Sequence, residues 1–163
     1  MNTLKAEKRS MDVKAKKLRR EGFVTGNLFG REIEGSIPLK FTKKEIEALL
    51  KNNNKGSQVM LELDGKTYDA LIKEVDYNPL AHTVEEVDFQ ALVSNEMVHS
   101  TAEIILENEE KVLSGVLQDE LKEVAYKALP ADLVDKIKVD VAGMKIGDTL
   151  RVKDLEIAKN KNI

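Results

Sequence analysis

The sequence predicts a mainly β protein with a few helices, of the α+β class, built from two small β-rich domains. Three observations lead to this fold class. Short segments of alternating apolar and polar residues end at turn-forming residues, only one segment has the full pattern of a capped amphipathic helix, and the composition is that of a globular protein. With 163 residues, of which 42% are hydrophobic and 34% charged, the chain is long enough to bury one large or two small cores.

Strands are expected wherever apolar and polar residues alternate. The predicted strands of the first domain cover residues 3–9, 24–30, 33–41, 59–63, 68–72 and 83–92. Asp64-Gly65, between the fourth and the fifth of these segments, indicates the tight turn of a β-hairpin.

Two helices are expected in the same domain. The first begins at Met11 and has a narrow apolar seam whose members recur every three or four residues. The seam consists of Met11, Ala15, Leu18 and Gly22. The second helix covers 42–52, where Thr42 and Glu45 form a capping-box pattern ahead of an apolar face.

A second domain is expected to begin near residue 93, which divides the chain into domains 1–92 and 93–163. Within it, the segments 101–107 and 111–117 flank a turn-like stretch and predict a second hairpin. The same alternation predicts strands over 136–141 and 149–155.

Several classes of function are excluded by what the sequence lacks. The chain has no cysteine, which excludes a disulfide scaffold, a thiolate metal site and a cysteine nucleophile. We find no leader and no apolar run long enough to span a membrane, and so expect a soluble cytoplasmic protein. His82 and His99 lie outside any metal or triad spacing, and Ser114-Gly115 lacks the nucleophile-elbow pattern. We therefore expect no enzyme, no metal and no cofactor.

The distribution of charge indicates an anion-binding surface. Residues 1–30 carry eight Lys/Arg against three Asp/Glu, whereas the remainder carries 18 against 26. The excess comes from a basic cluster that consists of Lys14, Lys16, Lys17, Arg19 and Arg20. A solvated helix face is the alternative, but acidic residues do not alternate with these cations and nearby glycines would let backbone approach a ligand. A folded RNA fits better than duplex DNA, because no recognition helix or zinc finger is present.

Several longer motifs follow one another along the chain in a fixed order. Arg9 ends the first predicted strand and is followed by Ala15-Lys16-Lys17-Leu18-Arg19, Gly22 and "VTGNLFG". "KEVDYNP", "EVDF" and "LPADLVDKIKVDVAGMKIGDTLRVKDL" follow farther along the chain. In this order they resemble the bacterial ribosomal protein family L-twenty-five, in its longer two-domain form, the general stress protein CTC type. The resemblance covers almost the whole chain.

The resemblance implies a six-stranded β-barrel that binds 5S rRNA at the central protuberance of the large ribosomal subunit, followed by a smaller β domain. Neighbouring ribosomal proteins are further partners that it allows. It implies phosphate contacts for several cations, a sugar or base contact for Phe29, and a place for Lys73 on a strand that faces the RNA. Together with the basic cluster, the expected RNA-binding residues are Arg9, Lys14, Lys16, Lys17, Arg19, Arg20, Phe29 and Lys73.

Three residues differ from the family pattern on the strands that would face RNA. Glu86 stands at a family histidine, Asp76 at a glutamine and Tyr77 at an arginine. Negative charge at these places opposes a phosphate backbone. This leaves open an alternative, a diverged stress-related paralogue that acts mainly through protein contacts and binds 5S rRNA weakly or not at all.

Overall fold

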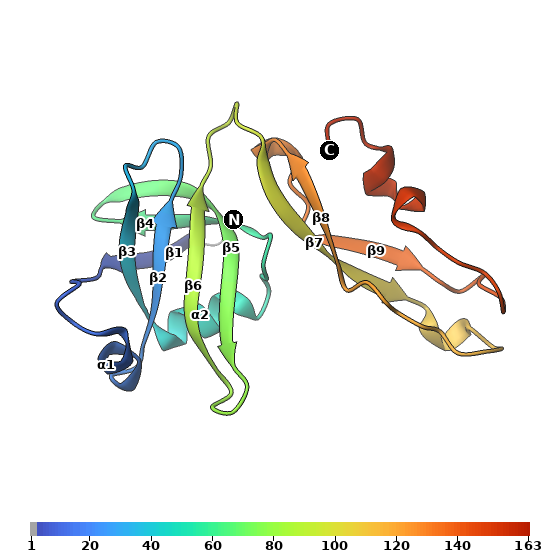
Figure 1. Ribbon diagram of the computed structural model, residues 1–163, viewed down its shortest axis with the longest axis horizontal. Helices are drawn as coiled ribbons and strands as arrows, with labels where there is room; N and C mark the ends of the chain where they lie inside the picture. Colours follow the sequence, from blue (N-terminus) through green and yellow to red (C-terminus); the bar gives the residue numbers. More distant parts are fainter. Residues whose placement is uncertain (1–2) are drawn as a thin grey trace. The chain divides into compact units, whose positions relative to one another are not determined.

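A computed structural model describes residues 3–163 and divides the chain into two compact units. The first unit ends at Glu96, and the second spans Met97–Ile163. Each unit surrounds its own apolar core. Most residues that belong to a helix or a strand lie in strands, which confirms the predicted mainly β class (Figure 1).

The first unit is a closed barrel of six strands (Figure 1). These are β1 (Thr3–Lys8), β2 (Phe23–Phe29), β3 (Ser36–Thr42), β4 (Gln58–Leu63), β5 (Lys66–Asn78) and β6 (Thr83–Ala91). Around the barrel the order is β1-β3-β2-β6-β5-β4, and β4 closes on β1. The β1–β4 and β2–β6 pairs are parallel, and the others are antiparallel. The predicted barrel and its β4–β5 hairpin are therefore confirmed.

The helix α2 (Lys43–Leu50) forms as predicted. The Thr42 hydroxyl accepts a hydrogen bond from the Glu45 backbone N–H, and Ile46 and Leu49 bury the apolar face against the barrel core. The cap satisfies one of the donors that a helix leaves unpaired at its start.

The predicted helix from Met11 is wrong in its extent. The helix α1 (Ala15–Arg20) has six residues, Met11 lies in a turn and is 71% exposed, and Leu18 alone of the seam is buried. The Ser10 hydroxyl bonds to the carboxylate and to the backbone N–H of Asp12. Such local side-chain bonds compete with helical hydrogen bonds and delay the start of the helix.

Gly26 is a packing residue of the barrel, because the backbone of a neighbouring strand fills the space where a side chain would lie. A Cβ atom at Gly26 would lie 1.9 Å from the backbone oxygen of Val87 on β6, and one at Gly30 would lie 2.9 Å from that of Ala91. These two glycines let β2 and β6 approach closely enough to form the parallel seam of the barrel.

The second unit is a three-stranded sheet in the order β8-β7-β9. Its strands are β7 (Val98–Glu107), β8 (Glu123–Ala128) and β9 (Lys136–Asp140). Short 3-10 turns complete it: η1 (Glu109–Lys111), η2 (Pro130–Asp132), η3 (Val152–Asp154) and η4 (Glu156–Lys159). The strand predicted over 136–141 is confirmed, and it pairs with β7 in parallel.

Two predicted strands of this unit are wrong. The antiparallel partner of β7 is β8, and the segment 111–117 is not a strand. The segment 149–155 contains a turn, where the Asp154 carboxylate accepts from the Arg151 backbone N–H. Alternation alone does not separate a strand from a turn that satisfies its N–H groups with side chains.

Gly26→Ala is expected to destabilise the barrel severely, because its methyl group would overlap the backbone of β6. We expect a loss of more than about 3 kcal/mol in the free energy of unfolding, measured by urea titration. Gly35→Ala is the control, because it has open space around it and a φ of +70°. It carries only the strain of a left-handed residue, about 1–2 kcal/mol. Equal losses in the two variants would contradict the close approach of β2 and β6.

Candidate nucleic-acid interface

The helix α1 lies against β2 and presents most of its circumference to solvent (Figure 1). Leu18 is its buried contact with the barrel. Gly22, with a φ of +89°, then turns the chain directly into β2. Because one apolar residue suffices to dock so short a helix, the other positions are left for charged side chains.

Four cations of the basic cluster point outward. Lys14, Lys16, Lys17 and Arg20 are all exposed. Within residues 3–163, only Lys17 of these four has a carboxylate within 4.0 Å, at 3.9 Å from Glu21. An exposed pair of this length contributes little to stability. These four charges are therefore available to an anionic partner.

Arg19 differs from its neighbours because it points toward the barrel. Its Nε donates to the backbone oxygen of Glu85 at 3.1 Å, and one terminal nitrogen donates to the Thr25 hydroxyl and to a Glu86 carboxylate oxygen, both at 3.2 Å. The other terminal nitrogen lies 3.7 Å from the Glu85 carboxylate. Only 30% of the Arg19 side chain is exposed. The guanidinium is thus largely used within the protein.

The β2–β6 seam explains why Arg19 reaches these acceptors. Thr25 of β2 stands in register with Glu86 of β6, and its buried hydroxyl donates to the Glu85 backbone oxygen at 3.3 Å. Thr25 and Glu85 were not predicted as part of the site. They lie 60 residues apart, and only the pairing of the two strands brings them together.

An acidic block lies on the outer face of β5 and β6. It consists of Glu74, Asp76, Glu86 and Asp88. Glu74 stands directly opposite Asp88, and Asp76 stands directly opposite Glu86, an arrangement that is unfavourable for like charges. Asn27 of β2 offsets part of this repulsion, because its backbone N–H donates to Asp88 at 2.9 Å and its amide donates to Asp88 and Glu86.

The surroundings raise the pKa of Glu86 above its ordinary value. Burial is the largest cause, and the nearby Asp88 carboxylate is the second. Arg19 and, more weakly, Arg9 act in the opposite direction, whereas Asp76 adds to the rise. The ion pair with Arg19 therefore does not fully offset the cost of keeping Glu86 charged.

The remaining predicted RNA-binding residues are spread over the barrel. Arg9 follows β1, donates to the Val13 oxygen at 3.3 Å, and lies close enough to affect Glu86. Phe29 lies at the far end of β2, about 20 Å along the strand from the end of α1. Lys73 lies on β5, where burial lowers its pKa and the nearby Lys55 adds to that effect. The structure gathers Arg9 and the basic cluster, and it places Phe29 away from them.

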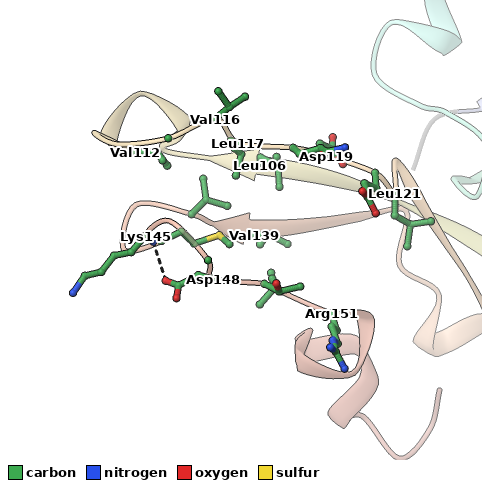
Figure 2. A pocket seen from close by; sticks show the side chains of 18 of the residues that line it. Leu106, Val112, Val116, Leu117, Asp119, Leu121, Val139, Lys145, Asp148 and Arg151 are labelled. Carbon is green, nitrogen blue, oxygen red and sulfur yellow. Dashed lines mark hydrogen bonds between the residues drawn. The ribbon is translucent and has the colours of Figure 1, made fainter.

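The second unit contains a hollow of about 670 Å³ (Figure 2). Its lining is mainly apolar, with Leu106, Val116 and Leu121 among the residues, and the Lys145 backbone N–H bonds to Asp148 at its edge. No histidine lines it. Within residues 3–163, no group of His, Asp or Glu side chains could hold a metal ion, and no helix is long and apolar enough to cross a membrane.

The raised pKa of Glu86 predicts that the ionised carboxylate lowers the free energy of unfolding, by an amount that depends on pH. Above the ordinary value of 4.5, the native state holds the Glu86 proton more tightly than the unfolded state does, so ionisation favours unfolding. The free energy of unfolding of the wild-type protein should therefore fall relative to that of Glu86→Gln as the pH rises from 4.5 through the folded-state pKa. Urea titrations over this range measure the difference, and a difference that is constant or changes in the opposite direction would contradict it.

Both units match known protein families. Residues 4–89 match the model of the family described as "Ribosomal L25p family". Residues 97–163 match the model described as "Ribosomal protein TL5, C-terminal domain". Among curated proteins, the large ribosomal subunit protein bL25 of Akkermansia muciniphila is 32% identical over 96% of this chain and 79% of its own length. The bL25 protein of Carboxydothermus hydrogenoformans is 33% identical over 93% and 80%, respectively. The chain therefore belongs to the Ribosomal L25p family, in its two-domain form.

Proposed function

We propose that the protein is a structural constituent of the large ribosomal subunit in the cytoplasm, and that it binds 5S rRNA at the central protuberance. The relatives' names support the first part, since they are large ribosomal subunit proteins. The observation that supports the second part is the set of exposed cations on and just before α1, of which, within residues 3–163, only Lys17 has a carboxylate within 4.0 Å, on a protein of net charge −3. Membership in a family of ribosomal proteins confirms the prediction that the chain is not an enzyme.

The exposed cations have the chemistry that a phosphate backbone requires. Lys14, Lys16 and Lys17 supply point charges on flexible stems, and Arg20 supplies a planar fork that can bond a phosphate through two nitrogens. Contacts of this kind fix a protein on RNA without reading its sequence. We assign this contact to domain 1–92, and we treat 93–163 as a separate domain.

The specific affinity for RNA tests this proposal. In a gel-shift titration we expect purified 5S rRNA to bind more tightly than unrelated RNA of equal length. Four phosphate contacts, at about 0.7 each, give a log–log salt slope of about −3. Removing two of them with Lys16→Glu and Lys17→Glu should weaken binding and reduce the slope to about −1.4.

A matched double variant distinguishes the loss of RNA contacts at α1 from the effect of a changed net charge. The double variant Lys5→Glu with Lys66→Glu changes the net charge by the same amount as Lys16→Glu with Lys17→Glu. Lys5 and Lys66 are both exposed and lie near the β1–β4 seam. The strand order places that seam across the barrel from the β2–β6 seam. This control should keep both affinity and slope. Equal effects of the two double variants would contradict binding through α1.

The alternative function is a paralogue that acts through protein contacts, and the acidic block is the observation that favours it. Sedimentation of cell lysate distinguishes the two. Stoichiometric sedimentation with the large subunit contradicts the alternative, and its absence, together with equal binding to 5S and unrelated RNA, contradicts our proposal.

A further inference from the structure

The contact between Arg19 and Glu86 sets one cation of the basic cluster apart from the others. Arg19 is the one member whose side chain is mostly covered, and within the described chain it bonds to a backbone oxygen, a hydroxyl and a carboxylate. The first two acceptors are neutral, and they hold the guanidinium in place against β2 and β6. The Glu86 carboxylate is the charged acceptor that hydrogen-bonds the guanidinium, at 3.2 Å, and the Glu85 carboxylate forms a longer ion pair with it, at 3.7 Å.

A carboxylate and a phosphate compete for the same donors of a guanidinium. Both offer two or more oxygens to its planar fork, and both form charge-assisted hydrogen bonds with it. At 30% exposure the Arg19 and Glu86 side chains are both still open to solvent, so an anion can approach the pair. Arg19 also lies on the same short helix as the exposed cations.

We propose that Glu86 acts as an internal substitute for an RNA phosphate on Arg19, and that it thereby limits the affinity of this protein for RNA. The proposal rests on the proposed function, because it concerns the strength of that same contact. A phosphate that takes Arg19 must displace Glu86, and it leaves the Glu86 charge opposite Asp76 and beside Asp88 without its cationic partner. Each bound complex therefore carries the cost of an unpaired carboxylate near RNA.

Glu86→Gln removes the competing charge and keeps the shape of the side chain. The bonds of Arg19 to the Glu85 backbone oxygen and to Thr25 do not involve Glu86, so they continue to hold the guanidinium. We expect this variant to bind 5S rRNA about tenfold more tightly at low salt. A tenfold change in Kd corresponds to the free energy that one charge-assisted hydrogen bond contributes. Its salt slope should be steeper by about 0.7, which corresponds to one added phosphate contact.

Asp76→Asn is the matched control. It removes one negative charge from the same acidic block, directly opposite Glu86, but Asp76 makes no ion pair with Arg19. If competition at Arg19 is the cause, this variant should gain less than about threefold in affinity and keep the wild-type slope. A gain equal to that of Glu86→Gln would show a general effect of charge and would overturn the proposal.

Arg19→Gln completes a double-mutant cycle. Glu86→Gln should give no gain in affinity when Arg19 is absent, and an undiminished gain there would overturn the proposal. Circular-dichroism melts check that each variant folds, and the comparison of Glu86→Gln with Asp76→Asn stands without the Arg19 variants.

The outcomes also separate this proposal from the proposed function. If Glu86→Gln binds 5S and unrelated RNA equally but still about tenfold more tightly than wild type, the 5S assignment fails and the role of Glu86 is supported. If wild type prefers 5S rRNA and Glu86→Gln binds equally or more weakly, the role of Glu86 is overturned alone. If neither protein binds any RNA, both fail.

Discussion

The parallel pairing of β2 with β6 is the constraint on which the rest of the first unit depends. It joins segments some 60 residues apart in the sequence, and it requires a glycine at position 26, since any side chain there would meet the Val87 carbonyl. The same pairing sets Thr25 beside Glu85 and Glu86. Because α1 leads directly into β2, this register also decides what Arg19 can reach.

One consequence is that neighbouring cations on one short helix have different roles. Lys16 and Arg20 extend into solvent and keep their charge available, whereas Arg19 joins the helix to the barrel through bonds to β2 and β6. The acidic block beside Arg19 makes this face of the barrel bipolar, with cations on α1 and carboxylates on β5 and β6. On one surface, the cations therefore attract an RNA and the carboxylates repel it. The balance between the two depends on the Arg19–Glu86 contact.

Most strands of the first unit and its capped helix were predictable, because apolar and polar residues alternate in the sequence and Thr42 and Glu45 give the helix a local signal. Closure of these strands into a barrel was implied only by the resemblance to the ribosomal family. The predictions were wrong where local side-chain bonds replace regular structure, as at Ser10 and Asp12 before α1 and at Asp154 in the second unit. The basic cluster could be predicted from the amino-acid composition of residues 1–30, but the direction of the Arg19 side chain toward the barrel could not. Its partners belong to a strand far along the chain, and no local pattern specifies that register.

In the free protein, β6 holds Arg19 against the barrel while the neighbouring Arg20 stays in solvent. The exchange rate of the Arg19 Nε–H with water, measured by NMR and assigned from its loss in Arg19→Gln, tests this most directly. We expect a separate resonance that exchanges much more slowly than that of Arg20, because the Glu85 backbone oxygen accepts the Arg19 Nε–H proton in a hydrogen bond. Exchange as fast as that of the exposed Arg20 would contradict it.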